Sequence, residues 1–304
     1  MELKIQAKLY LNYCEHRKAL SPKTLKAYRI DLRQFFDFFE SEEPCKEEIE
    51  SYITWLHEKF KQQTVKRKIA SIKAFYNYLE EEGIIEDSPL RKIRMKFKEN
   101  IILPKIIPRH EIEKLLSYMY NSRKKKERKH KYILRNIAVV EVLFATGARV
   151  YEISNISRNR VDLESGIIRI MGKGGKERYL PIGDSDVIEL LKEYYIHNKE
   201  AIERSGYFFT NRNGRRFTED AIRIMIKKYT KLAGIERHIT PHMFRHSCAT
   251  YLIEEGVDIS CVQRIMGHSS IKTTQIYIHI AMKEQIEILK NKHPRRLLKV
   301  RSVA

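Results

Sequence analysis

The strongest structural signal in the chain is "TPHMFRHSCATYLIEEGVDISCVQRIMGHSSIKTTQIYIH", residues 240–279. Thr240 can cap a helix and Pro241 suits its first position, so we expect a helix to begin here. His242 and Arg245 are three residues apart and therefore share one face of its first turns. Unpaired backbone N–H groups and the helix dipole favour an anion at that end, so the pair predicts a phosphate contact.

The same stretch predicts a second helix over residues 258–266, which Gly267 should end. His268 follows that helix directly, and Tyr277 comes nine residues later. A tyrosine hydroxyl titrates near ~10 and is a poor nucleophile unless its neighbours activate it. Because the chain contains 17 tyrosines, Tyr277 is informative only together with residues elsewhere.

A metal site is the rival interpretation of this stretch, because His238, His242 and His246 are spaced four apart. The helix should begin after His238, however, which breaks the helical spacing, and no carboxylate completes a ligand set. We therefore expect no metal here.

A second candidate lies in "ATGARVYEIS", residues 145–154. Arg149 follows a glycine turn and precedes a short apolar helix, where its guanidinium could hold a phosphate with two parallel hydrogen bonds. Taken alone, Arg149 could equally be an ordinary surface arginine.

A third candidate is "MGKGGKERYLP", residues 171–181, which predicts a β-hairpin with strands over residues 167–171 and 178–182. The glycine spacing and the strand–turn–strand context exclude a nucleotide-binding P-loop. Lys173 lies in the turn. There it could reach into DNA and give up a proton, or it could be one surface lysine among many.

The composition favours a polyanionic partner. The 304 residues carry a formal net charge of +20, and 42% of them are hydrophobic. The charge is uneven, with a net of +3 over residues 1–100 and +17 over residues 101–304. Nucleic acid is the partner that such an excess indicates, and the second part should meet phosphates itself. Four scattered cysteines without paired spacing indicate free thiols in a reducing compartment.

Residues 1–98 show helical periodicity throughout, and "ENIILPKIIP", residues 99–108, predicts a linker. The last helix of the first part should end at Gly83. Its basic face could be a phosphate-facing stripe or an ordinary solvated surface; it consists of Lys66, Arg67, Lys68 and Lys73. Further on, the polybasic run 121–131 could touch the DNA backbone or serve only solubility.

Together these segments resemble the tyrosine recombinase (phage integrase) family. The resemblance rests on "TGARVYEI", "GKGGKERYLPI", the stretch quoted first and the late "KHPR", which occur in the family's order. It covers about residues 10–290 and is closest to the Xer branch. It implies a mainly α fold with a small β-sheet: an N-terminal helical (SAM-like) core-binding domain over 1–98 and an α+β catalytic domain over 109–284.

The resemblance also implies roles for individual residues. By motif, the catalytic set would be Arg149, Lys173, His242, Arg245, His268 and the nucleophile Tyr277, with Glu152 in support. The chain departs from the family in its long basic run and in Tyr151, where a small residue is usual; neither change removes a catalytic group.

The implied activity is site-specific DNA strand exchange through a covalent 3′-phosphotyrosine, without cofactor, metal or ATP. Expected partners are double-stranded recombination sites and further copies of the chain, as a dimer on one site and a tetramer in the synapse, in which the tail 285–304 would contact a neighbour. An accessory protein or a second recombinase is a further possible partner. We expect a cytoplasmic, nucleoid-associated protein without a membrane partner.

Xer-like resolution of chromosome or plasmid dimers is the favoured role. Alternatives are an integrase or excisionase of a mobile element, a catalytically inactive architectural protein, and a type IB topoisomerase-like enzyme.

Overall fold

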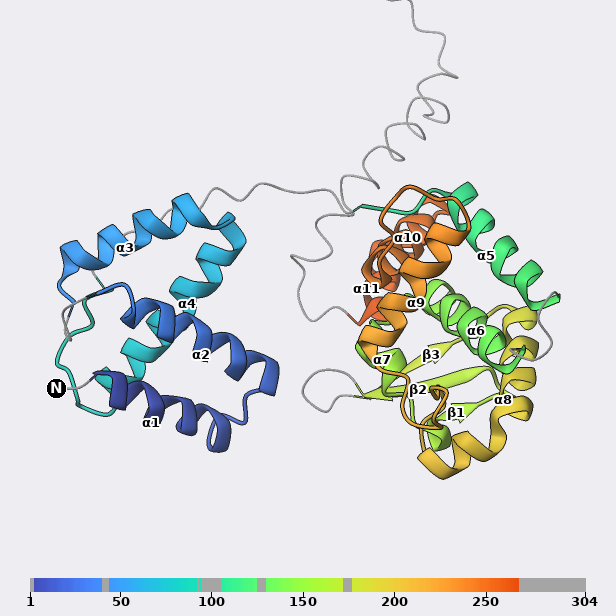
Figure 1. The fold of residues 1–304 in the computed structure, drawn as a ribbon, viewed down its shortest axis with the longest axis horizontal. Helices are drawn as coiled ribbons and strands as arrows, with labels where there is room; N and C mark the ends of the chain where they lie inside the picture. Colours follow the sequence, from blue (N-terminus) through green and yellow to red (C-terminus); the bar gives the residue numbers. More distant parts are fainter. Residues whose placement is uncertain are drawn as a thin grey trace, which may run out of the picture. The chain divides into compact units, whose positions relative to one another are not determined.

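A computed structural model of the chain describes residues 3–39, 44–91, 93, 105–124, 130–171 and 177–267. By contacts the chain divides into two compact units, Met1–Asn100 and Ile101–Ala304 (Figure 1).

The first unit is helical, as predicted. Its helices are α1 (Leu3–His16), α2 (Pro22–Phe36), α3 (Lys46–Lys59) and α4 (Gln62–Glu81). The hydroxyl of Ser21 accepts a hydrogen bond from the N–H of Thr24 at 3.2 Å, so Ser21 caps the start of α2. Gly83 follows α4 with φ +68°, a conformation that costs glycine little, and this confirms it as the stop signal.

Aromatic side chains build the core of the first unit. Tyr10, Phe35, Tyr52 and Phe75 are all fully buried. The rings of Phe35 and Tyr52 are 5.3 Å apart, and those of Tyr10 and Phe75 are 5.5 Å apart, both within the range of favourable aromatic pairs. Because each ring comes from a different helix, the four helices form one cluster.

The second unit is larger and contains helices around a small sheet. Its elements are α5 (Arg109–Lys124), α6 (His130–Thr146), α7 (Val150–Ser154), the 3-10 helix η2 (Arg158–Arg160), β1 (Val161–Asp162), β2 (Ile167–Met171), β3 (Glu177–Pro181), α8 (Ser185–Ser205), α9 (Glu219–Leu232), α10 (Pro241–Glu254) and α11 (Ile259–Met266). Helix α6 packs against α5, α8 and α10. Leu134, Ile137 and Leu143 on this helix have no exposed surface. This buried helix ends at Thr146, so it supports the turn that carries Arg149.

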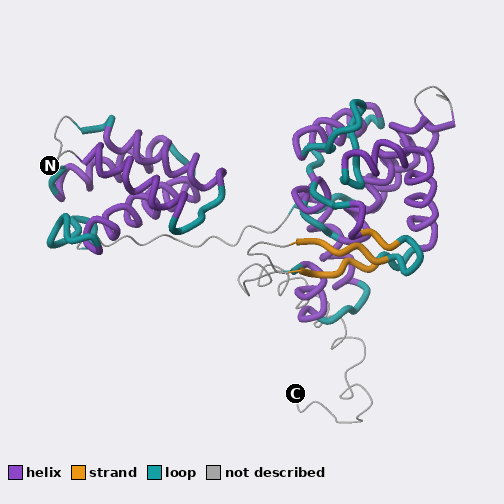
Figure 2. The backbone as a smooth tube through the Cα atoms, turned by 90° about the horizontal axis from the view of Figure 1, so that it is seen from below, coloured by secondary structure: helices purple, strands orange, loops and turns teal. Residues whose placement is uncertain are grey.

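The sheet is antiparallel in the order β1-β2-β3 (Figure 2). Ile168 pairs with Leu180 and Ile170 pairs with Arg178, which confirms the predicted hairpin. The turn residues 172–176, and with them Lys173, lie outside the described part of the chain. Strand β1 was not predicted, because two residues are too short to show an alternating pattern.

The predicted linker over residues 99–108 extends too far. Ile107 is fully buried in the core of the second unit. Its N–H donates to the Ser247 hydroxyl at 2.8 Å, and its carbonyl accepts from the Tyr251 hydroxyl at 2.5 Å. Residues 105–108 therefore belong to the second unit, and Ile107 docks on α10 instead of remaining in solvent.

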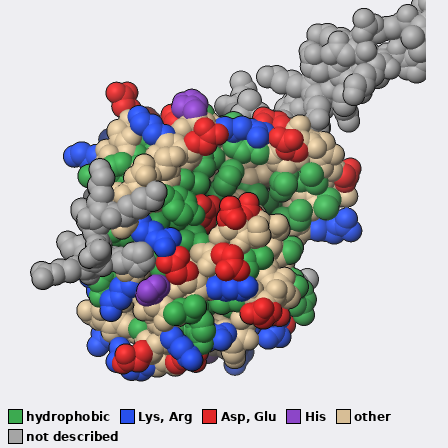
Figure 3. Space-filling view, turned by 90° about the vertical axis from the view of Figure 1, so that its right-hand side faces the viewer, with side chains coloured by type: hydrophobic (Ala, Val, Ile, Leu, Met, Phe, Trp, Pro, Cys, Tyr) green, Lys and Arg blue, Asp and Glu red, His purple; other side chains and the backbone are tan. Residues whose placement is uncertain are grey.

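The surface drawn in Figure 3 mixes charges of both signs, with Lys and Arg side chains lying among Asp and Glu side chains. Within the described ranges, no helix is both long enough and apolar enough to cross a membrane.

Candidate active site

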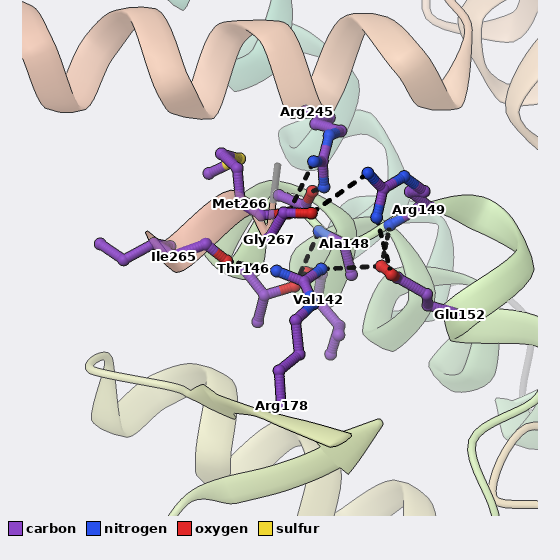
Figure 4. A network of polar contacts seen from close by, with 11 residues as sticks. Val142, Thr146, Ala148, Arg149, Glu152, Arg178, Arg245, Ile265, Met266 and Gly267 are labelled. Carbon is purple, nitrogen blue, oxygen red and sulfur yellow. Dashed lines mark hydrogen bonds and ion pairs between the residues drawn. The ribbon is translucent and has the colours of Figure 1, made fainter. Parts of the chain in front are cut away.

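Side chains from four segments converge where α6 gives way to α7. Figure 4 shows Arg149 and Glu152 from this junction, Arg245 from α10 and Arg178 from β3, all around the end of α11. The sequence predicted the first three of these residues as members of one site, and the structure brings them together.

Arg149 immediately precedes α7 in extended backbone conformation. Its N–H donates to one oxygen of Glu152 at 2.7 Å, and its guanidinium donates to the other at 3.0 Å. A second guanidinium nitrogen lies 3.4 Å from the carbonyl of Gly267. With 39% of the side chain exposed, Arg149 is anchored by these bonds and still accessible from solvent.

Glu152 is a buried carboxylate between two arginines. Only 3% of its side chain is exposed, and it also accepts from the Arg178 guanidinium at 2.8 Å. Burial alone would raise its pKa, but the Arg149 N–H and the charges of Arg178 and Arg149 outweigh burial and leave the pKa below its usual value. Glu152 is therefore ionised at neutral pH and orients both guanidinium groups.

Arg245 is more deeply placed, with 5% exposure. Its guanidinium donates to the carbonyl of Gly147 at 2.8 Å and to that of Met266 at 2.6 Å. It therefore ties the turn before Arg149 to the end of α11. These contacts span 98 and 21 residues of sequence, so helix periodicity alone did not indicate them.

His242 lies in the first turn of α10, as predicted, and its side chain is exposed. Desolvation by the surrounding protein lowers its pKa, and the nearby charges of Arg223, Arg245 and Arg149 lower it further. The imidazole is thus neutral at pH 7 and can accept a proton. Thr240 occupies the position before the helix, but its side chain makes no capping hydrogen bond.

Arg178 is the residue of this cluster that our sequence analysis did not select. Arg178 lies on β3 two residues before the buried Leu180. Because side chains alternate along a strand, both point to the same inner face of the sheet. The sequence did contain a signal for this residue, because an arginine at an inward-facing position of an alternating strand needs a buried partner. Its terminal nitrogens reach Glu152 and the carbonyl of Ile265.

Three predicted catalytic residues, Lys173, His268 and Tyr277, lie outside the described residues. The described chain ends at Gly267, whose peptide bond leads to His268. The tail 285–304 and residues 125–129 of the polybasic run also lie outside it.

The predicted basic stripe of the first unit is narrower than expected. Lys68 is 2% exposed, and its ammonium pairs with the buried Asp31 at 3.0 Å. Arg67 also pairs with Asp31, although nearly half of its side chain remains exposed. Lys68 is therefore an internal link between α2 and α4. Lys66 and Lys73 are half-buried and, with Arg67, stay candidates for phosphate contact.

Comparison with known proteins identifies the family. The profile described as Phage integrase family matches residues 105–284, and that of the Phage integrase N-terminal SAM-like domain matches residues 7–83. The chain belongs to the phage integrase family, whose members are tyrosine recombinases that cleave and rejoin DNA.

Individual relatives extend over most of the chain. A tyrosine recombinase of Agathobacter rectalis is 47% identical over 292 residues, which cover 94% of this chain and 95% of that protein. The tyrosine recombinase XerC of Thermodesulfovibrio yellowstonii is 34% identical over 297 residues, with 94% and 95% covered. The crystal structure of XerH bound to its difH substrate has 26% identity and a TM-score of 0.67, and covers 87% of this chain and 79% of that one. The predicted family, its likeness to Xer recombinases and the two-part fold are confirmed.

Proposed function

We propose that this protein exchanges DNA strands through a covalent bond between Tyr277 and a 3′-phosphate. The observation that carries the proposal is the convergence of Arg149 and Arg245 at the end of α11, beside an ionised Glu152. A phosphodiester bound there would meet two guanidinium groups within reach of the segment that begins at His268.

The charge balance of this cluster suits phosphoryl transfer. The charge of Arg178 is offset by its partner Glu152, so Arg149 and Arg245 leave a surplus of two positive charges. A phosphodiester carries one negative charge, and an attacking oxyanion adds a second in the transition state. Preorganised donors aimed at such developing charge usually contribute most to catalysis. The arginines would therefore take the place of a metal ion.

The proposed step transfers two protons. The Tyr277 hydroxyl gives its proton to the neutral His242, and its oxygen bonds to phosphorus. The bond from phosphorus to the 5′-oxygen breaks, and that oxygen takes a proton from Lys173. His268 would donate to a non-bridging oxygen. Because the phosphotyrosine conserves the energy of the broken bond, a 5′-hydroxyl can reverse the step without ATP.

The proposal extends to assembly and biological role. We propose that the chain binds double-stranded recombination sites as a dimer and pairs them as a tetramer, with the tail 285–304 contacting a neighbouring copy.

Relatives named XerC and XerD favour resolution of chromosome or plasmid dimers over integration of a mobile element. Mapping the chromosomal sites that the protein occupies distinguishes these roles: one locus supports the first, and the ends of a mobile element support the second. Accessory proteins would be found by copurification on such sites.

A nicked suicide duplex tests the chemistry. The wild-type protein should form an adduct with DNA that resists SDS, and Tyr277→Phe should abolish the adduct because the attacking oxygen is gone. Gel-shift affinity should stay within about threefold, since one hydroxyl contributes little to a phosphate-dominated interface. Tyr179→Phe, which removes an exposed hydroxyl from β3, is the matched control and should form adduct at the wild-type rate.

An adduct that persists in Tyr277→Phe would assign the nucleophile to another residue. DNA binding by the wild-type protein without any adduct, on the duplex that it occupies in cells, would instead support the architectural alternative.

A further inference from the structure

The end of α11 is held by arginines from three different elements. The carbonyl of Ile265 accepts from Arg178 on β3, that of Met266 from Arg245 on α10, and that of Gly267 from Arg149 before α7. The last carbonyls of a helix have no partner within the helix and carry the negative end of its dipole. Guanidinium groups satisfy both the hydrogen-bonding and the charge requirement.

Two of these arginines belong to the proposed phosphate clamp, and the third does not. Arg178 has 15% of its side chain exposed, and its two terminal nitrogens are bonded to Glu152 and Ile265. Its Nε has no hydrogen-bond partner among the described residues. A buried ion pair with an unpaired donor contributes little to the free energy of folding. Stability alone therefore does not explain why an arginine occupies position 178.

Arg178 also packs tightly against the turn that ends α11. Gly267 has φ +63°, and a Cβ built there would lie 2.9 Å from Cδ of Arg178 and 3.0 Å from its Nε. The side chain therefore packs closely against the turn at which the backbone leaves the helix, one residue before His268. The Arg178 guanidinium is held by the carboxylate of Glu152. The same carboxylate also accepts from Arg149, so the positions of the two arginines are coupled.

We propose that Arg178 is a positioning residue, which sets the end of α11 at Gly267, the residue before His268, against the arginine clamp. The inference rests on the proposed function of Arg149, Arg245 and Tyr277. Through Arg178, the β2–β3 hairpin would affect the end of α11 without any contact to the phosphate. A displacement of about 1 Å at a reacting atom can cost ~100-fold in rate, so a small shift of this turn is sufficient.

The test compares Arg178→Gln with Arg158→Gln. Arg158 is a matched control, because it also bonds one carboxylate, Glu203, and one backbone carbonyl, that of Val161. Arg178→Gln should lower the rate of adduct formation on a suicide duplex about 100-fold, with DNA affinity within about threefold of wild type. Arg158→Gln should retain the wild-type rate. Arg178→Lys should recover part of the loss, since an ammonium can reach one of the two acceptors.

A methylphosphonate duplex, in which methyl replaces one non-bridging oxygen at the scissile position, separates positioning from charge stabilisation. An arginine that neutralises the phosphate matters less on this uncharged substrate, so the defect of Arg149→Ala should shrink. The defect of Arg178→Gln should remain about 100-fold, because the nucleophile stays displaced. Gly267→Ala, which pushes Arg178 away, should reproduce the behaviour of Arg178→Gln on both substrates.

Amide hydrogen exchange of α11 provides a readout that needs no cleavage. Protection over residues 262–267 should fall in Arg178→Gln and not in Arg158→Gln. A wild-type adduct rate in a folded Arg178→Gln protein, unchanged protection of α11, or a defect that disappears on methylphosphonate would each overturn the inference. Absence of adduct from the wild type would count against the proposed function, and the exchange measurement would still decide whether Arg178 holds α11.

Discussion

At the scale of single residues, one buried carboxylate orients two guanidinium groups. Glu152 accepts from the backbone and side chain of Arg149 and from the side chain of Arg178. Replacing it leaves two arginines without their shared anion, and a buried charge that loses its partner is destabilising. The first unit contains a comparable buried carboxylate. Asp31 pairs with the ammonium group of Lys68 and keeps that side chain in the interior.

The pH dependence of stability tests the role of Glu152. Because its folded pKa lies below the ordinary value, ionisation stabilises the folded protein above the unfolded pKa of about 4.3, and this contribution is lost as pH falls through the folded pKa. Glu152→Gln should therefore lower the free energy of unfolding by about 1.5–3 kcal/mol at pH 7, and the difference from wild type should shrink below about pH 4.

Urea unfolding at several pH values measures this difference. Glu177→Gln is the control, because its pair with Arg160 at 3.4 Å is half-exposed and screened by solvent. A gap between Glu152→Gln and wild type that widens on acidification would contradict the assigned ionisation.

At the scale of elements, the turn that carries Arg149 and the end of α11 are packed against each other. Gly147 joins α6 to Arg149 with φ +59°, and its carbonyl accepts from Arg245. A Cβ at Gly147 would lie 2.6 Å from Cε and 2.7 Å from Sδ of the buried Met266. The positive φ favours glycine at this position, and an added Cβ would also require the Met266 side chain to shift.

Gly147→Ala should destabilise the protein by more than Gly206→Ala does. Gly206 has φ +72° but no atom within 4 Å of an added Cβ, so it isolates the strain of about 1–2 kcal/mol that positive φ costs alanine. The excess in Gly147→Ala should come from contact with Met266, and adduct formation should fall as the Arg245 acceptor moves.

Thermal melting and suicide-duplex cleavage measure the two effects. Equal destabilisation by the two alanines would show that Met266 adjusts freely and that only the backbone conformation matters.

At the scale of the whole molecule, charge and core are divided between the two units. Each has its own cluster of buried apolar residues. The first unit carries a net charge of +3 over residues 1–100, and residues 101–304 carry +17. Most counterion release on binding DNA should therefore come from the second unit.

Salt-dependent binding of the separate fragments tests this division. For residues 101–304, the plot of log affinity against log salt concentration should be almost as steep as for the whole chain. For residues 1–100 it should be much shallower. Fluorescence anisotropy on one duplex provides both slopes, with circular dichroism as the control that each fragment is folded. A steeper slope for residues 1–100 would place the main phosphate contacts in the first unit.

The sequence by itself determined the features that depend on neighbouring residues. Capping by Ser21, the stops at Gly83 and Gly267, the hairpin and the first turn of α10 all follow from local backbone preferences and short periodicities. The motifs also determined the family, because separated polar residues in a fixed order are specific even when each is ordinary alone.

Only the tertiary structure decided how distant segments meet. It placed Arg178 between Glu152 and Ile265, at separations of 26 and 87 residues, buried Lys68 against Asp31, and docked Ile107 on α10. Local patterns do not report these contacts, because the free energy of burying a charge or an apolar side chain depends on partners that folding alone brings together.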